Sequence, residues 1–213
     1  MPRSNPDHSR AHNSPGPIPH TLSDFLCIDF VNSRFTEHTG TGRVFDRIDL
    51  EAWQLWYARR CGIAVEHPPS TAMHRCLIEV RQLLRQLMES GQPPNPDAMR
   101  ELNRILAASS PLLMLSSMDD GVDLTPTWQH QDWRAVAAAT VISYAELSRS
   151  GGIDRIKVCA NPDCSYMFHD ETRNRSRRFC DAALCGTLSR VRRHRAHTSD
   201  ADPLTDTPTA RSR

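Results

Sequence analysis

The sequence predicts a mainly α fold: a helical N-terminal domain with short β-hairpin elements, followed by a small four-cysteine module that ends in a helix. Two observations carry this prediction. Four stretches between residues 50 and 149 repeat apolar residues with the 3.6-residue period of amphipathic helices. Beyond them, four of the seven cysteines fall within 27 residues, a density that a helical core does not require.

The first ordered stretch begins at Leu22. Residues 25–32 are apolar but short, which suits either a buried strand or the first turns of a core helix, and Thr-Gly-Thr-Gly at 39–42 then forms a turn. A clear helix is expected from about Leu50 to Arg60, with Asp49 at its N-cap and Gly62 just beyond its end. Its aromatic face is formed by Trp53, Trp56 and Tyr57.

A second helix is expected from about Ala72 to Ser90, because eight apolar residues keep the helical period for four turns and Gly91 closes it. The proline-rich connector that follows leads into a third helix, with Asn95 at the N-cap and Pro96 in the first position. The buried face predicted for this helix consists of Met99, Leu102, Ile105 and Leu106.

Apolar residues 112–115 and 122–124 flank Asp119-Asp120-Gly121, the pattern of a short hairpin. A fourth helix is expected from about Trp133 to Arg149, ending at Ser150-Gly151-Gly152. These elements define a helical domain over residues 22–150. The proline-rich lead-in, 1–20, and the aperiodic end, 198–213, are predicted to be disordered.

Composition excludes several classes of protein. The chain has 213 residues, of which 38% are hydrophobic and 24% charged, a composition typical of a globular protein. It lacks a run of about 18 apolar residues, and its first residues are polar. We therefore expect neither a membrane span nor a secretory signal, and we expect a cytoplasmic location.

The net charge of +1 hides an uneven distribution. Residues 155–197 hold ten basic and four acidic residues, a local balance of +6, which leaves −5 for the rest of the chain. A basic segment on an acidic body suggests a polyanionic partner.

Four cysteines of the basic segment form the pattern C-x4-C-x15-C-x4-C: Cys159, Cys164, Cys180 and Cys185. In a reducing compartment such a cluster favours metal binding over disulfides. Two pairs with equal spacing suit one structural Zn²⁺ with four thiolate ligands and no open position for catalysis. Another metal or cluster, and disulfides, are the alternatives. The sequence thus predicts a zinc-finger module over residues 153–197.

Arginines surround these cysteines, in the spacer and in a predicted helix over 182–196. On that helix Leu184, Leu188 and Val191 are expected to pack on the zinc module. The residues predicted to contact nucleic-acid phosphates are Arg173, Arg175, Arg177, Arg178, Arg190, Arg192, Arg193 and Arg195. In the helical domain, Asp29 and Asn32 are candidates for sensing a ligand, and bracing the first element is the alternative role.

Several motifs together resemble a known family. They are Cys-Ala-Asn-Pro-Asp-Cys at 159–164, Phe168-x-Asp170, residues 175–180, Cys185-Gly186 and residues 191–195, all similar to the CGNR zinc finger. Residues 26–32 look like the opening Leu-Asp-Phe-Val-Asn signature of the ABATE domain, which precedes this finger in bacterial proteins. Residues 50–53 and 102–103 are also similar. One departure stands out: Cys185-Gly186 continues as Thr187-Leu188, so the Asn and Arg of the family name are missing.

The resemblance implies a helical ABATE fold and a zinc-binding, DNA-binding transcriptional regulator connected with stress. Its expected partners are double-stranded DNA, a second copy in a homodimer, and an unknown small-molecule effector bound by the helical domain. The alternative function is a protein–protein adaptor whose basic module docks on an acidic partner. No catalytic motif is present in the sequence, so we expect no enzymatic activity.

Overall fold

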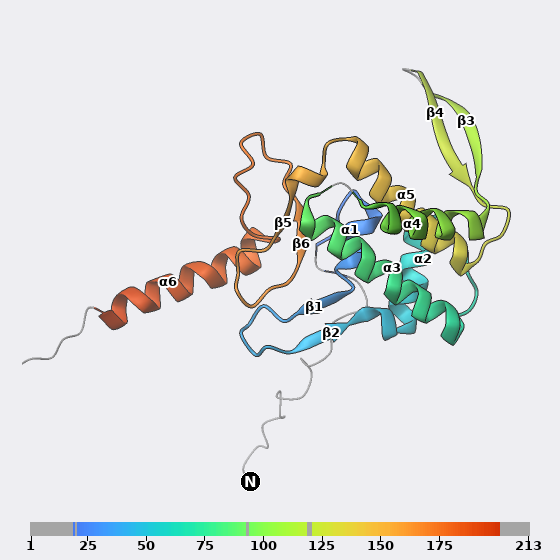
Figure 1. The fold of residues 1–213 in the computed structure, drawn as a ribbon. Helices are drawn as coiled ribbons and strands as arrows, with labels where there is room; N and C mark the ends of the chain where they lie inside the picture. Colours follow the sequence, from blue (N-terminus) through green and yellow to red (C-terminus); the bar gives the residue numbers. More distant parts are fainter. Residues whose placement is uncertain (1–18, 20, 93, 119–120, 201–213) are drawn as a thin grey trace, which may run out of the picture.

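The computed structural model describes residues 19, 21–92, 94–118 and 121–200 (Figure 1). It confirms the predicted fold class, because helices dominate, the strands form short antiparallel hairpins, and a four-cysteine cluster precedes the last helix. In chain order the main elements are α1 (Leu26–Val31), β1 (Arg34–Thr36), β2 (Val44–Asp46), α2 (Glu51–Arg60), α3 (Thr71–Ser90), α4 (Pro96–Ser109), β3 (Leu112–Met118), β4 (Gly121–Thr127), α5 (Trp133–Arg149), β5 (Ile156–Val158), β6 (Met167–His169) and α6 (Thr187–Asp200).

The segment 25–32, for which strand and helix were both open, forms α1. Cys27, Ile28, Phe30 and Val31 are all at most 1% exposed, so this helix is apolar nearly all round. A helix of that kind belongs in the middle of a core. It contacts α3, α5 and strand β6, and the ring of Phe30 lies 5.1 Å from the ring of Tyr57 on α2. Helix α1 therefore joins the helical body to the cysteine segment.

Helix ends follow the sequence signals in most places. Asn95 caps α4 by accepting from the Ala98 N–H at 2.8 Å, and Gly91 ends α3 in the left-handed region. The prediction that Asp49 caps α2 is wrong. Asp49 instead ends the short helix η1 (Arg47–Asp49), whose own cap is Asp46, and α2 starts after Leu50.

The buried face of α4 also differs from the prediction. Met99 is 41% exposed, whereas Ala98, Leu102 and Ile105 are buried. Ala98, Leu102 and Ile105 lie within a sector of about 60° around the helix axis, and Met99, about 100° from Ala98, falls outside that sector. The prediction chose the larger apolar residue where the helix buries the smaller one.

The β1–β2 and β3–β4 hairpins lie in different surroundings. Strands β1 and β2 pair with Phe35 opposite Phe45 and lie beside the cysteine segment. Strands β3 and β4 confirm the predicted hairpin but are longer than expected, and they project from the body (Figure 1). The predicted turn residues Asp119 and Asp120 lie outside the described residues.

The described residues near the two ends of the chain can be compared with the predicted disordered segments, 1–20 and 198–213. Helix α6 continues to Asp200, past residue 198 where the tail was predicted to begin. The remaining tail, 201–213, and all of the lead-in except residue 19 lie outside the described residues. In the part of the chain that the structure describes, no helix has the length and hydropathy needed to cross a bilayer.

Candidate metal centre

The four predicted cysteine ligands converge on one point. Their sulfur atoms all lie within 4.8 Å of one another, and all four side chains are buried. The Sγ of Cys180 is 3.7 Å from the Sγ atoms of both Cys164 and Cys185. A tetrahedron with Zn–S bonds of about 2.3 Å has edges of roughly 3.8 Å, whereas a disulfide bond measures about 2.05 Å. The spacing fits a single tetrahedral Zn²⁺.

The first pair of cysteines is set by a tight turn. Cys159 directly follows β5, and its N–H donates to the carbonyl of Tyr166 at 2.9 Å. Cys164 then closes the turn by donating its N–H to the carbonyl of Asn161, also at 2.9 Å. Asn-Pro-Asp is favourable turn material, so the local sequence itself brings the two sulfurs together.

The second pair is set by η3 (Ala182–Gly186), a single wide helical turn. Asp181 caps it by accepting from the Leu184 N–H at 2.8 Å, and its carbonyl accepts from the Gly186 N–H at 3.1 Å. This turn returns Cys185 to the side on which Cys180 lies. Helix α6 starts immediately afterwards at Thr187.

Electrostatics favour a cation at this point. The Cys159 and Cys164 sulfurs, followed by burial, raise the pKa of the Cys180 thiol. Four thiolates at this spacing repel one another, so a divalent cation is needed to hold them all deprotonated. Two N–H groups point at sulfur: Asn161 Nδ2 is 3.6 Å from Cys185 Sγ, and Cys180 N is 3.5 Å from Cys159 Sγ. Bound zinc supplies a cross-link here, and because protein fills all four positions it is structural.

The metal cluster is packed against the helical body. Phe35 from β1 belongs to the same buried cluster as the four cysteines, and its ring meets the Tyr166 ring edge-on at 5.1 Å. The buried Arg47 guanidinium donates to the Tyr166 hydroxyl at 2.6 Å and covers the Phe35 ring. The β1–β2 hairpin thus forms one wall of the metal centre.

Asn161 connects three parts of the structure. Its side chain is fully buried, and its Nδ2 donates both to Cys185 Sγ and to the carbonyl of His38 in the β1–β2 loop. Its Oδ1 accepts from Arg192 on α6 at 2.7 Å, and Arg192 also pairs with Asp163. One amide therefore ties the metal ligands, the hairpin and α6 together.

The tip of the β1–β2 hairpin approaches this ion pair closely. Gly40 has φ +92°, and a Cβ placed there would lie 3.2 Å from Asp163 Oδ2 and 3.5 Å from Arg192 Nη2. Both the backbone conformation and the space favour glycine at this position.

Comparison with known families agrees with this geometry. Residues 24–151 match the ABATE family model, described as "Putative stress-induced transcription regulator", and residues 155–198 match the CGNR zinc finger. The chain belongs to the ABATE family. No curated protein shows significant sequence similarity to it.

In this ABATE protein the two candidates for sensing a ligand, Asp29 and Asn32, both make contacts within the fold. Asp29 is buried, accepts from the Ser23 N–H at 2.8 Å and lies 3.4 Å from the Arg60 guanidinium. Burial raises its pKa to about 6, against the opposing effects of Ser23 and Arg60. The cavity beside it has a volume of about 40 Å³, room for little more than water.

Asn32 fastens the ABATE body to the CGNR finger. Its Nδ2 donates to the Met167 carbonyl and its Oδ1 accepts from the Met167 N–H, each at 2.8 Å. The side-chain amide thus makes the same two hydrogen bonds with the Met167 backbone that a residue of a neighbouring strand would make. The contacts of Asn32 are those of a brace between the two segments.

The eight predicted phosphate-contacting arginines of the CGNR finger fall into two groups. Arg177, Arg190 and Arg192 are engaged within the protein: Arg177 donates to the carbonyls of Phe179 and Cys180, and Arg190 donates to the carbonyl of Gly186. The rest of the set has exposed side chains: Arg173, Arg175, Arg178, Arg193 and Arg195. Of these, Arg178 and Arg195 also have contacts within the protein, Arg178 with the ring of Phe179.

The apolar residues predicted to pack α6 on the module behave differently from the prediction. Val191 is 41% exposed, so its expected packing is wrong, and Leu184 and Leu188 are only half-buried. Polar contacts of Arg192, described above, hold the start of α6 instead. The apolar spacing in the sequence predicts packing of this helix, but it does not predict the ion pair between Arg192 and Asp163 that holds the helix.

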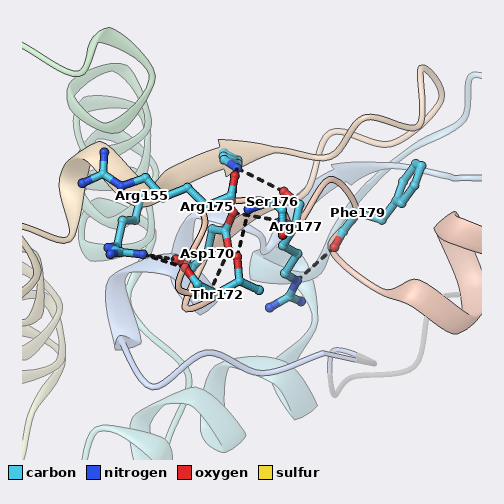
Figure 2. A network of polar contacts seen from close by, with 8 residues as sticks. Arg155, Asp170, Thr172, Arg175, Ser176, Arg177 and Phe179 are labelled. Atoms are coloured by element: carbon cyan, nitrogen blue, oxygen red, sulfur yellow. Dashed lines mark hydrogen bonds and ion pairs between the residues drawn. The ribbon is translucent and has the colours of Figure 1, made fainter.

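Asp170 organises the arginine-bearing loop of this ABATE protein, a role that the sequence pattern does not predict (Figure 2). Its buried carboxylate accepts from Lys157 Nζ, from the N–H and hydroxyl of Thr172, and from the Arg177 N–H, at 2.6–3.0 Å. Burial alone would raise the pKa of this carboxyl, but the hydrogen bonds from Lys157 and Thr172 hold it well below its usual range. The only sequence signal was its place in the family motif.

Two basic residues complete this network, and Figure 2 labels one of them, Arg155. Lys157 also donates to the carbonyls of Arg175 and Arg177, and Arg155 Nη1 donates to the carbonyls of Asp170 and Thr172. The loop backbone is therefore held from inside while its exposed arginines face solvent.

We expect Asp170→Asn to loosen this loop, because the neutral amide cannot accept from Lys157 and two backbone donors as a carboxylate does. Tryptic cleavage after the loop arginines should become roughly ten-fold faster, since proteolysis follows the population of the open form. Glu171→Gln makes the same acid-to-amide change at the next, exposed residue and should leave the cleavage rate unchanged. Equal rates for both variants would contradict the role given to Asp170.

Proposed function

We propose that this ABATE protein is a DNA-binding transcriptional regulator whose CGNR finger contacts the phosphates of duplex DNA. The observation that carries the proposal is the arrangement of arginines around the metal centre. Arg173, Arg175 and Arg178 extend from a loop held by Asp170, and Arg193 and Arg195 extend from a helix fixed by Arg192. Phosphate contacts require guanidinium groups on a backbone whose position is set.

Charge supports the same assignment. Residues 155–197 carry a balance of +6 on a body that is acidic overall. Phosphate contacts of this kind supply affinity without sequence preference, and they make binding fall with salt. The proposal gives the chain a regulatory role and no catalytic one. Sensing by the ABATE body remains part of the proposal, although Asp29 and Asn32 are used in structural contacts.

The test is binding of the full-length, zinc-loaded chain to labelled random-sequence duplex DNA, followed by fluorescence anisotropy across a range of salt concentrations. The log–log slope of affinity against salt should be about −0.9 per phosphate contacted. Absence of duplex binding at low salt would refute the proposal. Binding to an acidic protein surface without any to DNA would favour the adaptor function.

Single substitutions sharpen that test. Arg178→Ala and Arg193→Ala should each weaken binding to all duplexes about equally and reduce the steepness of the salt slope by about 1. Arg59→Ala removes an exposed arginine from α2 in the ABATE body and is the matched control. An equal loss of affinity in Arg59→Ala would show that net charge, and not the finger, determines binding.

A further inference from the structure

The β3–β4 hairpin holds large apolar side chains in solvent. Every described residue of its two strands is exposed except Pro126, which is half-buried. The exposed fraction is 62% for Leu113, 72% for Leu115, 72% for Val122 and 55% for Leu124. Leu112, Met114 and Met118 are about half exposed as well. Isolated apolar residues on a surface are ordinary, but a contiguous set of seven on one element is not.

The strand register divides these residues between two unlike faces. Leu115 pairs with Leu124, Ser117 with Val122, and Leu113 with Pro126, so their side chains share one face of the hairpin. We call this the Leu115 face: Leu113, Leu115, Ser117, Val122, Leu124 and Pro126. The opposite face mixes apolar residues with polar ones: Leu112, Met114, Ser116, Met118, Asp123, Thr125 and Thr127.

Such a division is typical of a sheet that is buried on one side and solvated on the other. The described residues of the same chain do not cover the Leu115 face, because the hairpin projects away from the helices (Figure 1). A two-stranded hairpin without a covered face is marginally stable in water. A partner molecule is therefore the natural cover for this face.

A second copy of this chain fits the face best. Between Ser110 and Thr127 the sequence contains no lysine or arginine, and its charges are Asp119, Asp120 and Asp123. Asp123 lies on the opposite face, so the Leu115 face itself carries no charge that a partner would have to match. An uncharged apolar surface of this kind is complementary to itself, which is the requirement for a two-fold interface.

The size of the hairpin surface agrees with a dimer. The exposed apolar area of the Leu115 face is on the order of 500 Å² per copy, at the upper end for patches on monomers. Two copies would bury on the order of 1,000 Å², about the smallest area of a specific interface. Pro126 lacks an N–H, which disfavours further strands at the edge of β4 and so favours a closed pair.

The position of the hairpin keeps the apolar surface away from the arginines that we propose contact DNA. The hairpin and α6 extend from opposite sides of the body (Figure 1). We propose that the β3–β4 hairpin is the homodimer interface of this protein, with the Leu115 face packed on the same face of a second copy. This inference does not depend on DNA binding, and it is tested without DNA.

The test is sedimentation of the full-length, zinc-loaded chain from about 1 to 100 μM. The unmodified chain should dimerise in this range, and Leu115→Lys should weaken dimerisation by at least 100-fold, because it places a charge at the centre of an apolar contact. Met114→Lys puts the same charge on the neighbouring residue of the opposite face and should dimerise like the unmodified chain. Both side chains are exposed in the single chain, so neither change should disturb its folding, which circular dichroism checks.

Two results would overturn the proposal. One is an unmodified chain that stays monomeric at 100 μM. The other is a Met114→Lys variant that dissociates as readily as Leu115→Lys, which would show that the Leu115 face is not the buried one. An unmodified chain that dimerises but does not bind duplex DNA would refute the proposed function and would support the proposed dimer interface.

Discussion

Removing the metal is expected to unfold the CGNR finger and to lower the melting temperature of the whole chain. Structural zinc contributes about 10–16 kcal/mol of apparent binding free energy at neutral pH, and in a small module this energy is folding energy. The finger has little other core, since its buried cluster consists mainly of the four cysteines and a few aromatic rings. The body loses stability as well, because Phe35 and Arg47 pack on the finger.

Elemental analysis should find about one zinc per chain, and Cys180→Ser should lose it. Thermal unfolding followed by circular dichroism should show the same large loss for this variant and for chelator-treated protein. Cys76→Ser is the matched control, because Cys76 is a half-buried free cysteine on α3 outside the cluster. A Cys180→Ser variant with full zinc content, or an unchanged melting curve after chelation, would contradict the structural role of the metal.

Replacing Asn32 with alanine is expected to destabilise the protein by about 2–6 kcal/mol. The change leaves the N–H and the carbonyl of Met167 buried without partners, and each such group costs about 1–3 kcal/mol. For a domain of this size that is a decrease in melting temperature of roughly 4–24 °C. Equilibrium urea unfolding and calorimetry would measure both quantities.

Asn103→Ala serves as the control, since Asn103 is exposed on α4 and alanine is the better helix former there. Its stability should be unchanged or slightly increased. An Asn32→Ala protein as stable as the unmodified chain would show that Asn32 does not brace the finger, and it would return Asn32 to the candidates for ligand sensing.

Local chemistry explains which parts of the fold were predictable. The α4 start follows from Asn95 and Pro96, and the end of α3 follows from Gly91, because caps are made by neighbouring residues. The four ligands followed from their spacing, since each turn needs only its own few residues. Asp49 failed as a cap because the chain before it folds into η1, and a single helical turn leaves little trace in sequence.

Contacts between distant residues were not predictable in the same way. Clustering of arginines was visible in the sequence, but the separation of Arg177 and Arg192 from the exposed members was not. Arg177 donates to backbone carbonyls, which every residue has, and Arg192 depends on an asparagine 31 residues away. The bracing roles of Asn32 and Asp170 likewise depend on partners that only the folded chain brings near.

The ion pair of Arg192 with Asp163 has a consequence for the direction of every side chain on α6. Successive residues of an α-helix are rotated by about 100° around its axis. A contact that holds one side chain in place therefore sets the rotation of the whole helix about its axis. It also sets the directions in which Arg193 and Arg195 extend. A substitution at Arg192 would let α6 turn about its own axis, so that those two arginines change direction although neither has been altered.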